Sequence, residues 1–554
     1  MKHTSNPVSR ILKLVSLEKK EIYQIYFYAI IYGIIMLVIP VGIQALISFA
    51  QTATISTSVV LLVIFIVLSV FVSGVLQVNQ LRIIEKIQQK IFVRYGFSFA
   101  QKIPQLNLSA TNDYYLPELV NRFFDTLTLQ KEIAKLLLDF PLAIVQIFFG
   151  LILLSFYHPV FIAFGLILVL VVYGILYFSG KRGLITSIEE STYKYKVVAW
   201  LQEMARIIRS VKFAKSAHFT LQKADASITG YLQFRTEHFK VLLFQYKTLV
   251  GFKVLVTASM LSVGTFLLIN QQLTVGQFIA AEIVILTILN SVEKLIIDLD
   301  SVYDVLTAVD KIEQLTDKDS EKQGTVLYTQ QNHVGLTITI QNLSFGYTGT
   351  DNVVRDISLE ALPGEKVCIS GNDGSGKSTL LRLLTGMYDD FTGNILFDHI
   401  PLKNYNLHQL RQNMGVMISQ QDIFEGTLMD NITMGLENPD MDELVYLCKK
   451  TGLSDFLNTL KNGFDTPLNT SGRKLSATVV RKILLVRALI NKPALLLLEE
   501  PWYGLETQYQ QQIKTLLLQE MKGTTMFIIS NEQKFAAACD KTIHMKNNKN
   551  KNHD

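Results

Sequence analysis

A run of 60 residues without a single Asp, Glu, Lys or Arg, from Ile22 to Leu81, constrains the fold of this chain more than any other feature. A helix that crosses a membrane needs about 20 predominantly apolar residues. The run is therefore long enough for two spans joined by a short turn, and the polar residues 51–54 are the candidate turn. The sequence thus predicts a membrane protein with several spans.

Two further uncharged runs extend this pattern, at residues 140–180 and 254–281, and a largely apolar stretch follows at 278–297. Polar interruptions at residues 157–159 and 270–272 divide them. Since each divided part is long enough for one span, we predict six transmembrane helices, near residues 22–50, 57–80, 137–156, 160–179, 243–269 and 276–298.

The composition excludes several classes of protein. Of the 554 residues 49% are hydrophobic and 18% are charged, whereas soluble domains carry about 25% charged residues. A purely soluble enzyme, a disordered chain and a coiled-coil rod are therefore disfavoured. The formal net charge of +5 is too small to indicate a nucleic-acid partner. The three cysteines have no metal-binding spacing, and their scarcity is typical of a reducing cytosolic face.

Orientation follows from the distribution of Lys and Arg. The arm at residues 1–21 and the long stretches 82–135 and 181–240 are rich in both, and the three short turns contain neither. The positive-inside rule then places both termini and both long stretches in the cytoplasm. The turns near Thr52, His158 and Gln271 should face outward. A secretory signal is disfavoured because its apolar core spans only about 7–15 residues.

Two features of the membrane half bear on function. The apolar periodicity continues past the second and fourth spans, so these helices should extend well into the cytoplasm. Glu282 lies inside the sixth span, where an acid is expensive and usually faces a cavity or a partner. The alternative is a carboxylate close enough to the interface to reach water, and the sequence leaves both interpretations open.

The second half of the chain has the composition of a soluble domain. We predict a cytoplasmic N-terminal arm, a six-helix transmembrane domain, a polar linker, a soluble domain and a polar tail, at residues 1–21, 22–315, 316–334, 335–545 and 546–554. In the soluble domain short β-rich runs alternate with helical patterns. This alternation predicts an α/β fold with parallel strands.

The strongest motif matches G-x-x-x-x-G-K-[ST] in full, between an apolar strand pattern and a helical pattern. Its glycines let backbone N–H groups cradle phosphate oxygens, Lys377 reaches the β and γ phosphates, and the Ser378 hydroxyl ligates Mg²⁺. A chance glycine-rich turn is the alternative. The motif predicts nucleotide binding by Gly371, Asn372, Asp373, Gly374, Ser375, Gly376, Lys377, Ser378 and Thr379.

The order of motifs resembles that of the ATP-binding cassette (ABC) transporters of the exporter type, in which six helices are fused to one cassette, a P-loop NTPase domain. The resemblance implies ATP and Mg²⁺ as cofactors. It assigns Tyr347 to adenine stacking, Gln420 or Gln421 to the Mg²⁺-reaching glutamine (with Gln420 favoured), Glu499 to Mg²⁺ binding and Glu500 to the general base. The alternatives are a core tyrosine at 347 and solvated acids after a buried strand at 499–500.

Several positions depart from the family pattern. The usual Leu-Ser-Gly-Gly-Gln signature, which caps the γ-phosphate in the opposite subunit, is replaced by the segment 475–479. Ser476 is retained, but Ala477 and Thr478 add Cβ atoms where close backbone approach is wanted. The expected switch histidine is Asn531, which donates a hydrogen bond but cannot become charged. These changes predict slow hydrolysis with binding preserved. The alternative is a lineage in which the altered residues are working variants, and one sequence does not separate the two.

The resemblance implies an ATP-driven, dimeric half-transporter in the bacterial inner (cytoplasmic) membrane. Its partners would be the lipid bilayer, a second half-transporter subunit and a periplasmic adaptor protein, with no nucleic acid. A secreted peptide or protein is the favoured cargo. About twenty residues precede the first span, so no peptidase-like domain is expected there. Alternatives are a weakly hydrolysing regulatory subunit and a membrane-anchored scaffold of a secretion assembly.

Overall fold

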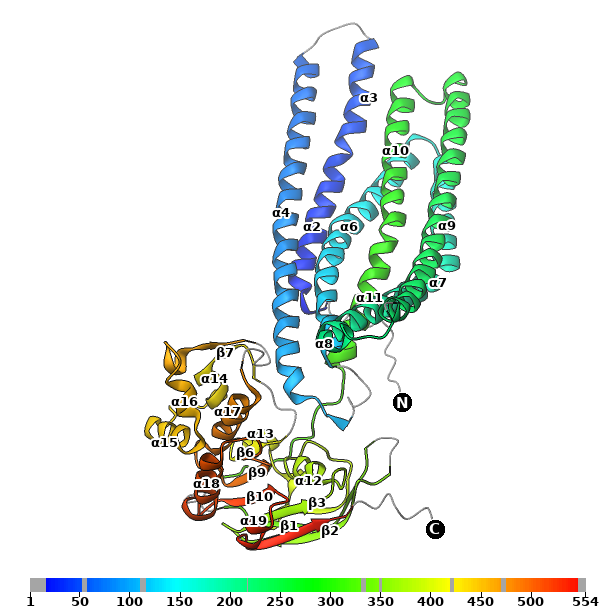
Figure 1. The fold of residues 1–554 in the computed structure, drawn as a ribbon. Coiled ribbons are helices and arrows are strands. Elements are labelled where there is room, and N and C mark those ends of the chain that lie inside the picture. The colour runs from blue at the N-terminus through cyan, green and yellow to red at the C-terminus, as the bar shows by residue number, and fades with distance from the viewer. Residues whose placement is uncertain are drawn as a thin grey trace. The chain divides into compact units, whose positions relative to one another are not determined.

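The computed structural model describes residues 16–51, 57–109, 116–216, 218–329, 335–347, 351–418, 423–469 and 475–546. The chain forms two compact units. The first comprises residues 1–105 and 114–318, and the second comprises residues 106–113 and 319–554. The first is helical and the second is an α/β domain (Figure 1). This is the predicted fold class.

The first unit consists of long helices. They are α2 (Lys19–Met36), α3 (Val38–Gln51), α4 (Thr57–Lys102), α5 (Leu116–Asn121), α6 (Asp125–Tyr157), α7 (Val160–Arg206), α8 (Ile208–Val211), α9 (Phe219–Ile269), α10 (Val275–Ile297) and α11 (Leu299–Thr316). Among the described residues, six helical segments are long and apolar enough to cross a membrane. The predicted six spans are thus confirmed as helices, and α4 and α7 continue far beyond their apolar parts, as the periodicity predicts.

Local sequence explains where the helices bend and end. The first span is broken at Leu37, between α2 and α3, three residues before Pro40. Pro40 has no N–H to donate to the carbonyl of residue 36, and its ring crowds that carbonyl. The last span begins at Thr274, whose hydroxyl accepts from the Gln277 N–H while the Gln277 side chain accepts from the Thr274 N–H. This capping box fixes the start of α10 after the predicted polar turn.

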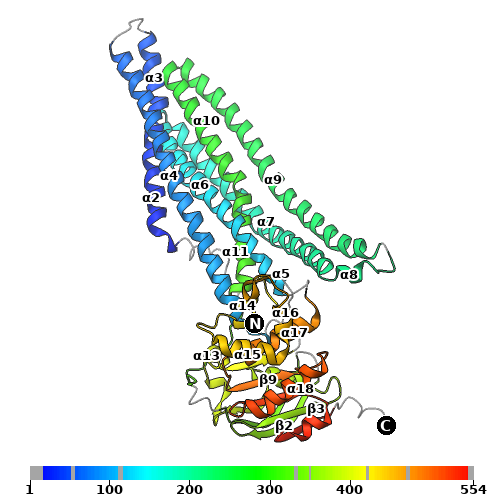
Figure 2. The ribbon, with the colours of Figure 1, turned by 60° about the vertical axis from the view of Figure 1, so that its left-hand side comes forward.

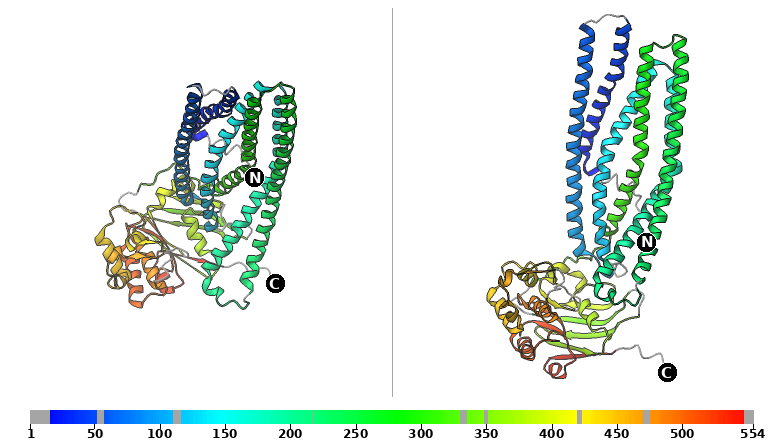
Figure 3. Two further views of the ribbon diagram at one scale, coloured as in Figure 1. Left: turned by 90° about the horizontal axis from the view of Figure 1, so that it is seen from above. Right: turned by 45° about the horizontal axis from the view of Figure 1, so that its top comes forward.

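Within the first unit, α6 and α10 lie between α2–α4 on one side and the pair α7 and α9 on the other (Figure 3). The helices α7 and α9 run side by side over much of their length (Figure 2). Small residues allow close approach: a Cβ on Gly183 of α7 would lie 2.4 Å from the Tyr303 ring of α11, and one on Gly150 of α6 would lie 2.9 Å from Ile288 of α10.

Much apolar surface on these helices is exposed in the single chain. Phe71 of α4 is 67% exposed and Leu170 of α7 is 68% exposed. Soluble monomers rarely expose contiguous apolar surface on this scale. Such surface is stable only against lipid or a protein partner, which agrees with membrane-spanning helices. Glu282 is half-buried on α10. We find no hydrogen bond or ion pair to its side chain among the described residues, so both interpretations of this acid remain open.

The second unit is built on two sheets. An antiparallel sheet has the order β2-β1-β4-β5, with β1 (Ile338–Phe345), β2 (Val354–Ala361), β4 (Thr392–Phe397) and β5 (Ile400–Pro401). A parallel sheet has the order β11-β3-β10-β9-β6, with β3 (Lys366–Gly371), β6 (Met414–Met417), β9 (Leu495–Glu499), β10 (Thr525–Ile529) and β11 (Lys541–Met545). The parallel sheet was predicted, and the antiparallel one was not.

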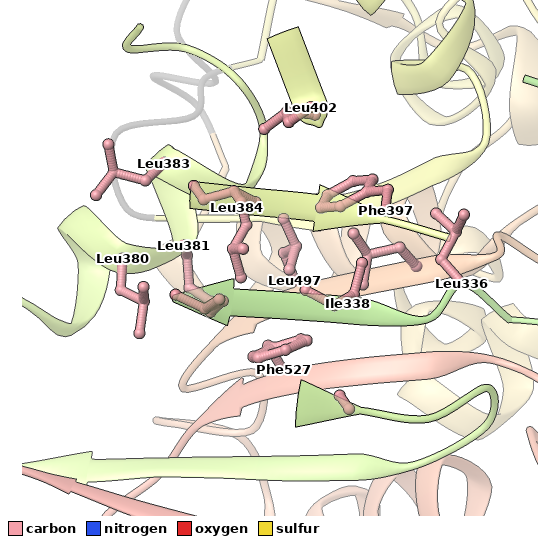
Figure 4. Close-up of a cluster of buried hydrophobic side chains, with 14 of the residues drawn as sticks. Leu336, Ile338, Leu380, Leu381, Leu383, Leu384, Phe397, Leu402, Leu497 and Phe527 are labelled. Carbon is pink, nitrogen blue, oxygen red and sulfur yellow. The ribbon is translucent and has the colours of Figure 1, made fainter. Parts of the chain in front are cut away.

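Short helices surround the sheets. They are α12 (Lys377–Leu384), α13 (Leu407–Arg411), α14 (Leu428–Thr433), α15 (Met441–Thr451), α16 (Leu453–Leu457), α17 (Ala477–Leu489), α18 (Thr507–Thr515) and α19 (Gln533–Ala537), with the two-residue strands β7 (Gly426–Thr427) and β8 (Pro467–Leu468) near α14. Leucines of α12 pack with Leu497 of β9 and Phe527 of β10 in one buried cluster (Figure 4). This packing fixes the start of α12 against the parallel sheet.

A short segment from between α4 and α5 belongs to the second unit. The Asn107 N–H donates to the Asp319 carbonyl at 3.0 Å, and the Ser109 hydroxyl donates to the Asp390 carboxylate at 3.0 Å. The segment predicted to be a linker is also held on this unit, since Arg411 forms a two-pronged ion pair with Glu321. The connections between the two halves of the sequence are therefore anchored by side chains of the α/β domain.

Candidate nucleotide-binding site

The predicted phosphate-binding loop joins β3 to α12. The strand β3 is the second strand of the parallel sheet and ends at Gly371, and α12 begins at Lys377 with Gly376 as its N-cap. The loop between them therefore points its backbone N–H groups, together with the positive end of the helix dipole, at one place. Such a helix N-terminus binds anions, and phosphates above all.

Two positions in this loop require glycine. Gly371 has φ 144° and Gly376 has φ 91°, backbone conformations that other residues rarely adopt. A Cβ on Gly376 would lie 2.7 Å from the Val353 carbonyl oxygen, and one on Gly371 would lie 2.2 Å from the Met545 carbonyl oxygen. Backbone carbonyl groups of neighbouring segments thus contact the outer side of the loop, and the backbone N–H groups of the loop line its inner side.

The polar side chains of the loop fit a phosphate ligand. The Ser375 hydroxyl is buried without a hydrogen-bond partner in the described part of the chain. The Lys377 ammonium donates to the carbonyl oxygens of Gly371 and Asn372, at 2.7 Å each. Leaving a buried hydroxyl unpaired costs about 1–3 kcal/mol. A phosphate would supply an acceptor to the Ser375 hydroxyl and to the third N–H of the Lys377 ammonium.

The two predicted Mg²⁺ ligands are neighbours. The Ser378 hydroxyl, in the first turn of α12, donates to the Glu499 carboxylate at the end of β9. A hydroxyl, one carboxylate and phosphate oxygens are the oxygen ligands that Mg²⁺ takes at phosphate sites, with the remaining positions left to water. The residues present therefore fit the ion. Glu499 has one methylene more than an aspartate would have, and its carboxylate still lies next to Ser378.

Glu500 and Asn531 lie at the same edge of the sheet. In the parallel register Ile529 of β10 is opposite both Glu499 of β9 and Ile369 of β3. The carboxyl ends of these three strands therefore lie side by side at one edge of the sheet. Ligands of open α/β sheets bind at these carboxyl ends. Glu500 has φ 45°, a strained conformation for a side chain that is not glycine. No hydrogen bond to its carboxylate is found among the described residues, so the carboxylate is available to a water.

The side chain of Asn531 is bound to the phosphate loop. Its Oδ1 accepts a hydrogen bond from the Gly371 N–H at 3.0 Å. The switch position is therefore in contact with the first glycine of the loop. Sequence reasoning predicted the position of Asn531 but not this contact.

Tyr347 follows β1 and is half-buried. Its hydroxyl is 3.1 Å from the Thr379 hydroxyl, and its ring packs edge-on against Phe345 and Tyr388, with centroids 5.1 Å and 5.6 Å apart. Burial raises the pKa of Tyr388, so that side chain stays neutral. The structure thus places the predicted adenine-stacking residue beside the last residue of the phosphate-binding motif.

The predicted γ-phosphate cap is the N-cap of α17. The Ser476 hydroxyl accepts from the Val479 N–H at 3.2 Å, and Ser476 and Ala477 are exposed. Thr478, in the first turn of the helix, is half-buried. An exposed helix N-terminus with a serine cap suits a phosphate brought by another molecule. The preceding residues 470–474 lie outside the described part.

Gln420 and Gln421, the third and fourth residues after β6 in the sequence, also lie outside the described residues. The strand next to β6 in the sheet is β9, which runs parallel to it and ends at Glu499. The chain therefore leaves β6 at the edge of the sheet where Glu499 lies.

Sequence reasoning assigned no role to two supporting residues. Arg481 of α17 donates to the Glu500 carbonyl at 3.0 Å and lies 5.2 Å from the centre of the Tyr503 ring. Arg382 of α12 donates to the Tyr347 hydroxyl at 3.4 Å. The only signal for Arg382 was its position one helical turn after Thr379. Arg481 contacts a residue 19 positions away through tertiary packing, for which the sequence has no local signal.

A phosphate-binding loop at the carboxyl end of a parallel sheet, in one chain with six apolar helices, defines a membrane protein with a fused nucleotide-binding domain. Residues 23–292 match the family model described as the ABC transporter transmembrane region. Residues 354–503 match a second family model, described as ABC transporter. The chain belongs to the ABC transporter family. The resemblance drawn from the motifs is thereby confirmed.

Curated relatives match over part of the chain. The ATP-dependent lipid A-core flippase of Pseudomonas aeruginosa is 34% identical over 221 residues, which are 40% of this chain and 36% of the flippase. The lactococcin-G-processing and transport ATP-binding protein LagD of Lactococcus lactis is 28% identical over 281 residues, which are 50% of this chain and 40% of LagD. The matched stretches thus span less than half the length of these relatives.

A solved structure matches over nearly the whole chain. A bacterial Atm1-family ABC exporter with ATP bound has a TM-score of 0.82 and 17% sequence identity, covering 96% of this chain and 94% of that one. At this identity the likeness shows the fold, which is that of an ABC exporter.

Proposed function

We propose that the chain is one half of a dimeric, ATP-driven ABC exporter. The observation that carries this proposal is the intact phosphate-binding loop, with Lys377 inside it and Ser378 beside Glu499, in the same chain as six apolar helices. One cassette and six helices make half of a transporter in this family. The second half would be another copy of the chain or a related subunit, and the Ser476 end of α17 would face its ATP.

Hydrolysis would depend on position and charge more than on covalent chemistry. The loop N–H groups and Lys377 hold the phosphates, and Tyr347 holds the adenine. Glu500 orients and deprotonates the attacking water. Ser378 and Glu499 would hold Mg²⁺, which would supply neutralising charge to the phosphates, and the family resemblance adds Gln420 or Gln421 to its ligands. Closure of two cassettes would move the membrane helices, and the anchored segment at Asn107–Ser109 is a direct connection from cassette to helices.

The runner-up is a regulatory subunit that binds ATP and hydrolyses it weakly. What favours it is the combination of Ala477 and Thr478 at the phosphate-capping helix end with an uncharged Asn531 bound to Gly371. An ATPase assay on the purified chain alone separates the two. Measurable Mg²⁺-dependent phosphate release supports the exporter half, and ATP binding without release supports the regulatory subunit.

The cargo is proposed only as a class. We favour peptide or protein secretion, supported by the processing and transport role printed in the name of LagD. The name of the flippase points instead to lipid A-core. A periplasmic adaptor protein is a further candidate partner if the cargo is a peptide or protein.

We further propose that the protein resides in the bacterial inner membrane with both termini in the cytoplasm. In a variant lacking Cys368, Cys448 and Cys539, a cysteine at Gln271 should react with an impermeant maleimide added to intact cells, because Gln271 is exposed in a short turn without Lys or Arg. A cysteine at Asp225, exposed on α9, should react only after the cells are opened.

A cysteine at Ser187, in the long stretch 181–240 that is placed in the cytoplasm, would be a poorer probe than one at Asp225, because the Ser187 side chain is buried and bound to Thr307. Strong labelling of the Asp225 cysteine in intact cells would contradict the orientation.

A further inference from the structure

The backbone of Glu500, the predicted general base, has a conformation that its own sequence does not favour. Its φ of 45° lies in the left-handed region, which is strained for a residue with a side chain. Such strain persists only where the surrounding structure fixes it, and it is frequent at functional sites. The contacts around Glu500 therefore decide where its carboxylate lies.

Three hydrogen bonds fix this backbone. The Glu500 N–H donates to the Ile529 carbonyl at 3.1 Å, and the Glu500 carbonyl accepts from the Tyr503 N–H at 3.1 Å and from the Arg481 guanidinium at 3.0 Å. Since the carboxylate has no hydrogen bond of its own among the described residues, its position depends on this backbone. Two of the three donors are backbone N–H groups. Only the contact from Arg481 depends on the identity of a side chain.

Arg481 is placed to hold the Glu500 carbonyl firmly. It is half-buried on α17, and its guanidinium lies 5.2 Å from the centre of the Tyr503 ring, a cation–π contact that restricts its movement. Among the described residues it has no acidic partner, and the Glu500 carbonyl is its one hydrogen-bond acceptor. A hydrogen bond from a charged donor is stronger than one between neutral groups.

The helix that carries Arg481 also carries the predicted phosphate cap. Arg481 lies five residues after Ser476, the N-cap of α17. In the proposed dimer this helix start would face the ATP of the second half, whereas Glu500 belongs to the ATP site of the same chain. A single helix therefore connects the cap of one site with the general base of the other.

We propose that Arg481 is a positioning residue for ATP hydrolysis, which holds the backbone of Glu500 so that the carboxylate meets the attacking water. Arg481 acts through Glu500 and not on the nucleotide. The general base is thereby tied to the helix that would cap the ATP of the second half. This role rests on the proposed function, of which it names a further residue.

The first test compares variants of the full-length protein in lipid. Arg481→Ala should lower the maximal rate of phosphate release at least about tenfold, since general-base catalysis contributes about 10²–10⁴ in rate. The KM for ATP should change less than about twofold, because no contact with the nucleotide is lost. Arg481→Lys keeps a cation that can donate, so it should be faster than Arg481→Ala. The control Lys449→Ala, which removes an exposed lysine of α15, should equal the parent.

An Arg481→Ala protein as fast as the parent, or one altered only in KM, would overturn the proposal. A double-mutant cycle then tests whether Arg481 acts through Glu500. In a Glu500→Gln protein the base is absent, so adding Arg481→Ala should lower the single-turnover rate no further. A further loss as large as that in the parent background would contradict the positioning role.

Hydrogen exchange tests the same contact without hydrolysis. In Arg481→Ala without nucleotide, the N–H groups of Glu500 and Tyr503 should exchange at least about threefold faster, because the turn that they hold opens more often. Unchanged ATP affinity would show that the variant folds, and unchanged exchange at both groups would overturn the proposal. If the parent does not hydrolyse ATP, the proposed function fails, and the exchange rates still decide whether Arg481 holds Glu500.

Discussion

Restoring the family pattern at four positions should raise ATP turnover by at least about tenfold. The variant combines Ala477→Gly, Thr478→Gly, Val479→Gln and Asn531→His. In other enzymes the loss of one charge-stabilising donor costs about 2.7–4 kcal/mol, or roughly 10²–10³ in rate. The structure puts the first three positions in the first turn of α17, where Ala477 is exposed and Thr478 and Val479 are half-buried, and it puts Asn531 beside the phosphate loop. Steady-state phosphate release by the purified protein in lipid measures the change.

The gain should require all of the restored contacts. Asn531→Ala removes the hydrogen bond to the Gly371 N–H without adding a histidine, and it should not raise turnover. Val479→Gln preserves the backbone N–H that Ser476 accepts from, so the helix cap survives. If the unmodified chain already turns over as fast as the restored variant, the altered signature does not limit the rate. The regulatory-subunit alternative would then lose its main support.

Lys377→Ala should weaken ATP binding about 100-fold or more. Hydrogen bonds to charged groups are worth about 1.5–3 kcal/mol, and about 1.4 kcal/mol is a factor of ten in affinity. Lys377 is expected to reach two phosphates, and its ammonium now donates to two carbonyl oxygens of the loop. Equilibrium binding of a fluorescent ATP analogue to the protein in lipid measures the loss.

The matched control is Lys403→Ala, which removes an exposed lysine of the same domain and should leave the affinity unchanged. An affinity of the Lys377→Ala protein equal to that of the parent would show that the phosphates bind elsewhere.

The sequence predicts the membrane helices and the phosphate loop because both depend on local patterns. Uncharged runs of sufficient length can only be buried in lipid or protein, and the loop motif is contiguous from Gly371 to Thr379. Even the break at Leu37 has a local cause in Pro40. The antiparallel sheet was not predicted, because β1, β2 and β4 pair across loops and the sequence has no short hairpin signal.

The side-chain contacts that support the nucleotide-binding site could not be predicted, because they join residues far apart in the chain. Asn531 meets Gly371 only because β10 and β3 are neighbours in the sheet. Arg481 of α17 likewise donates to the carbonyl of Glu500, the residue directly after β9, which lies 19 positions along the chain.

The central claim is that this chain uses its own cassette to hydrolyse ATP. The direct measurement is Mg²⁺-dependent phosphate release by the full-length protein, alone in lipid, compared with its Glu500→Gln variant at saturating ATP. Loss of a general base costs about 10²–10⁴ in rate. We expect slow release by the parent, release lowered at least tenfold by Glu500→Gln, and unchanged ATP affinity in the variant. Equal release by the two proteins, or none by a parent that binds ATP, would contradict the account.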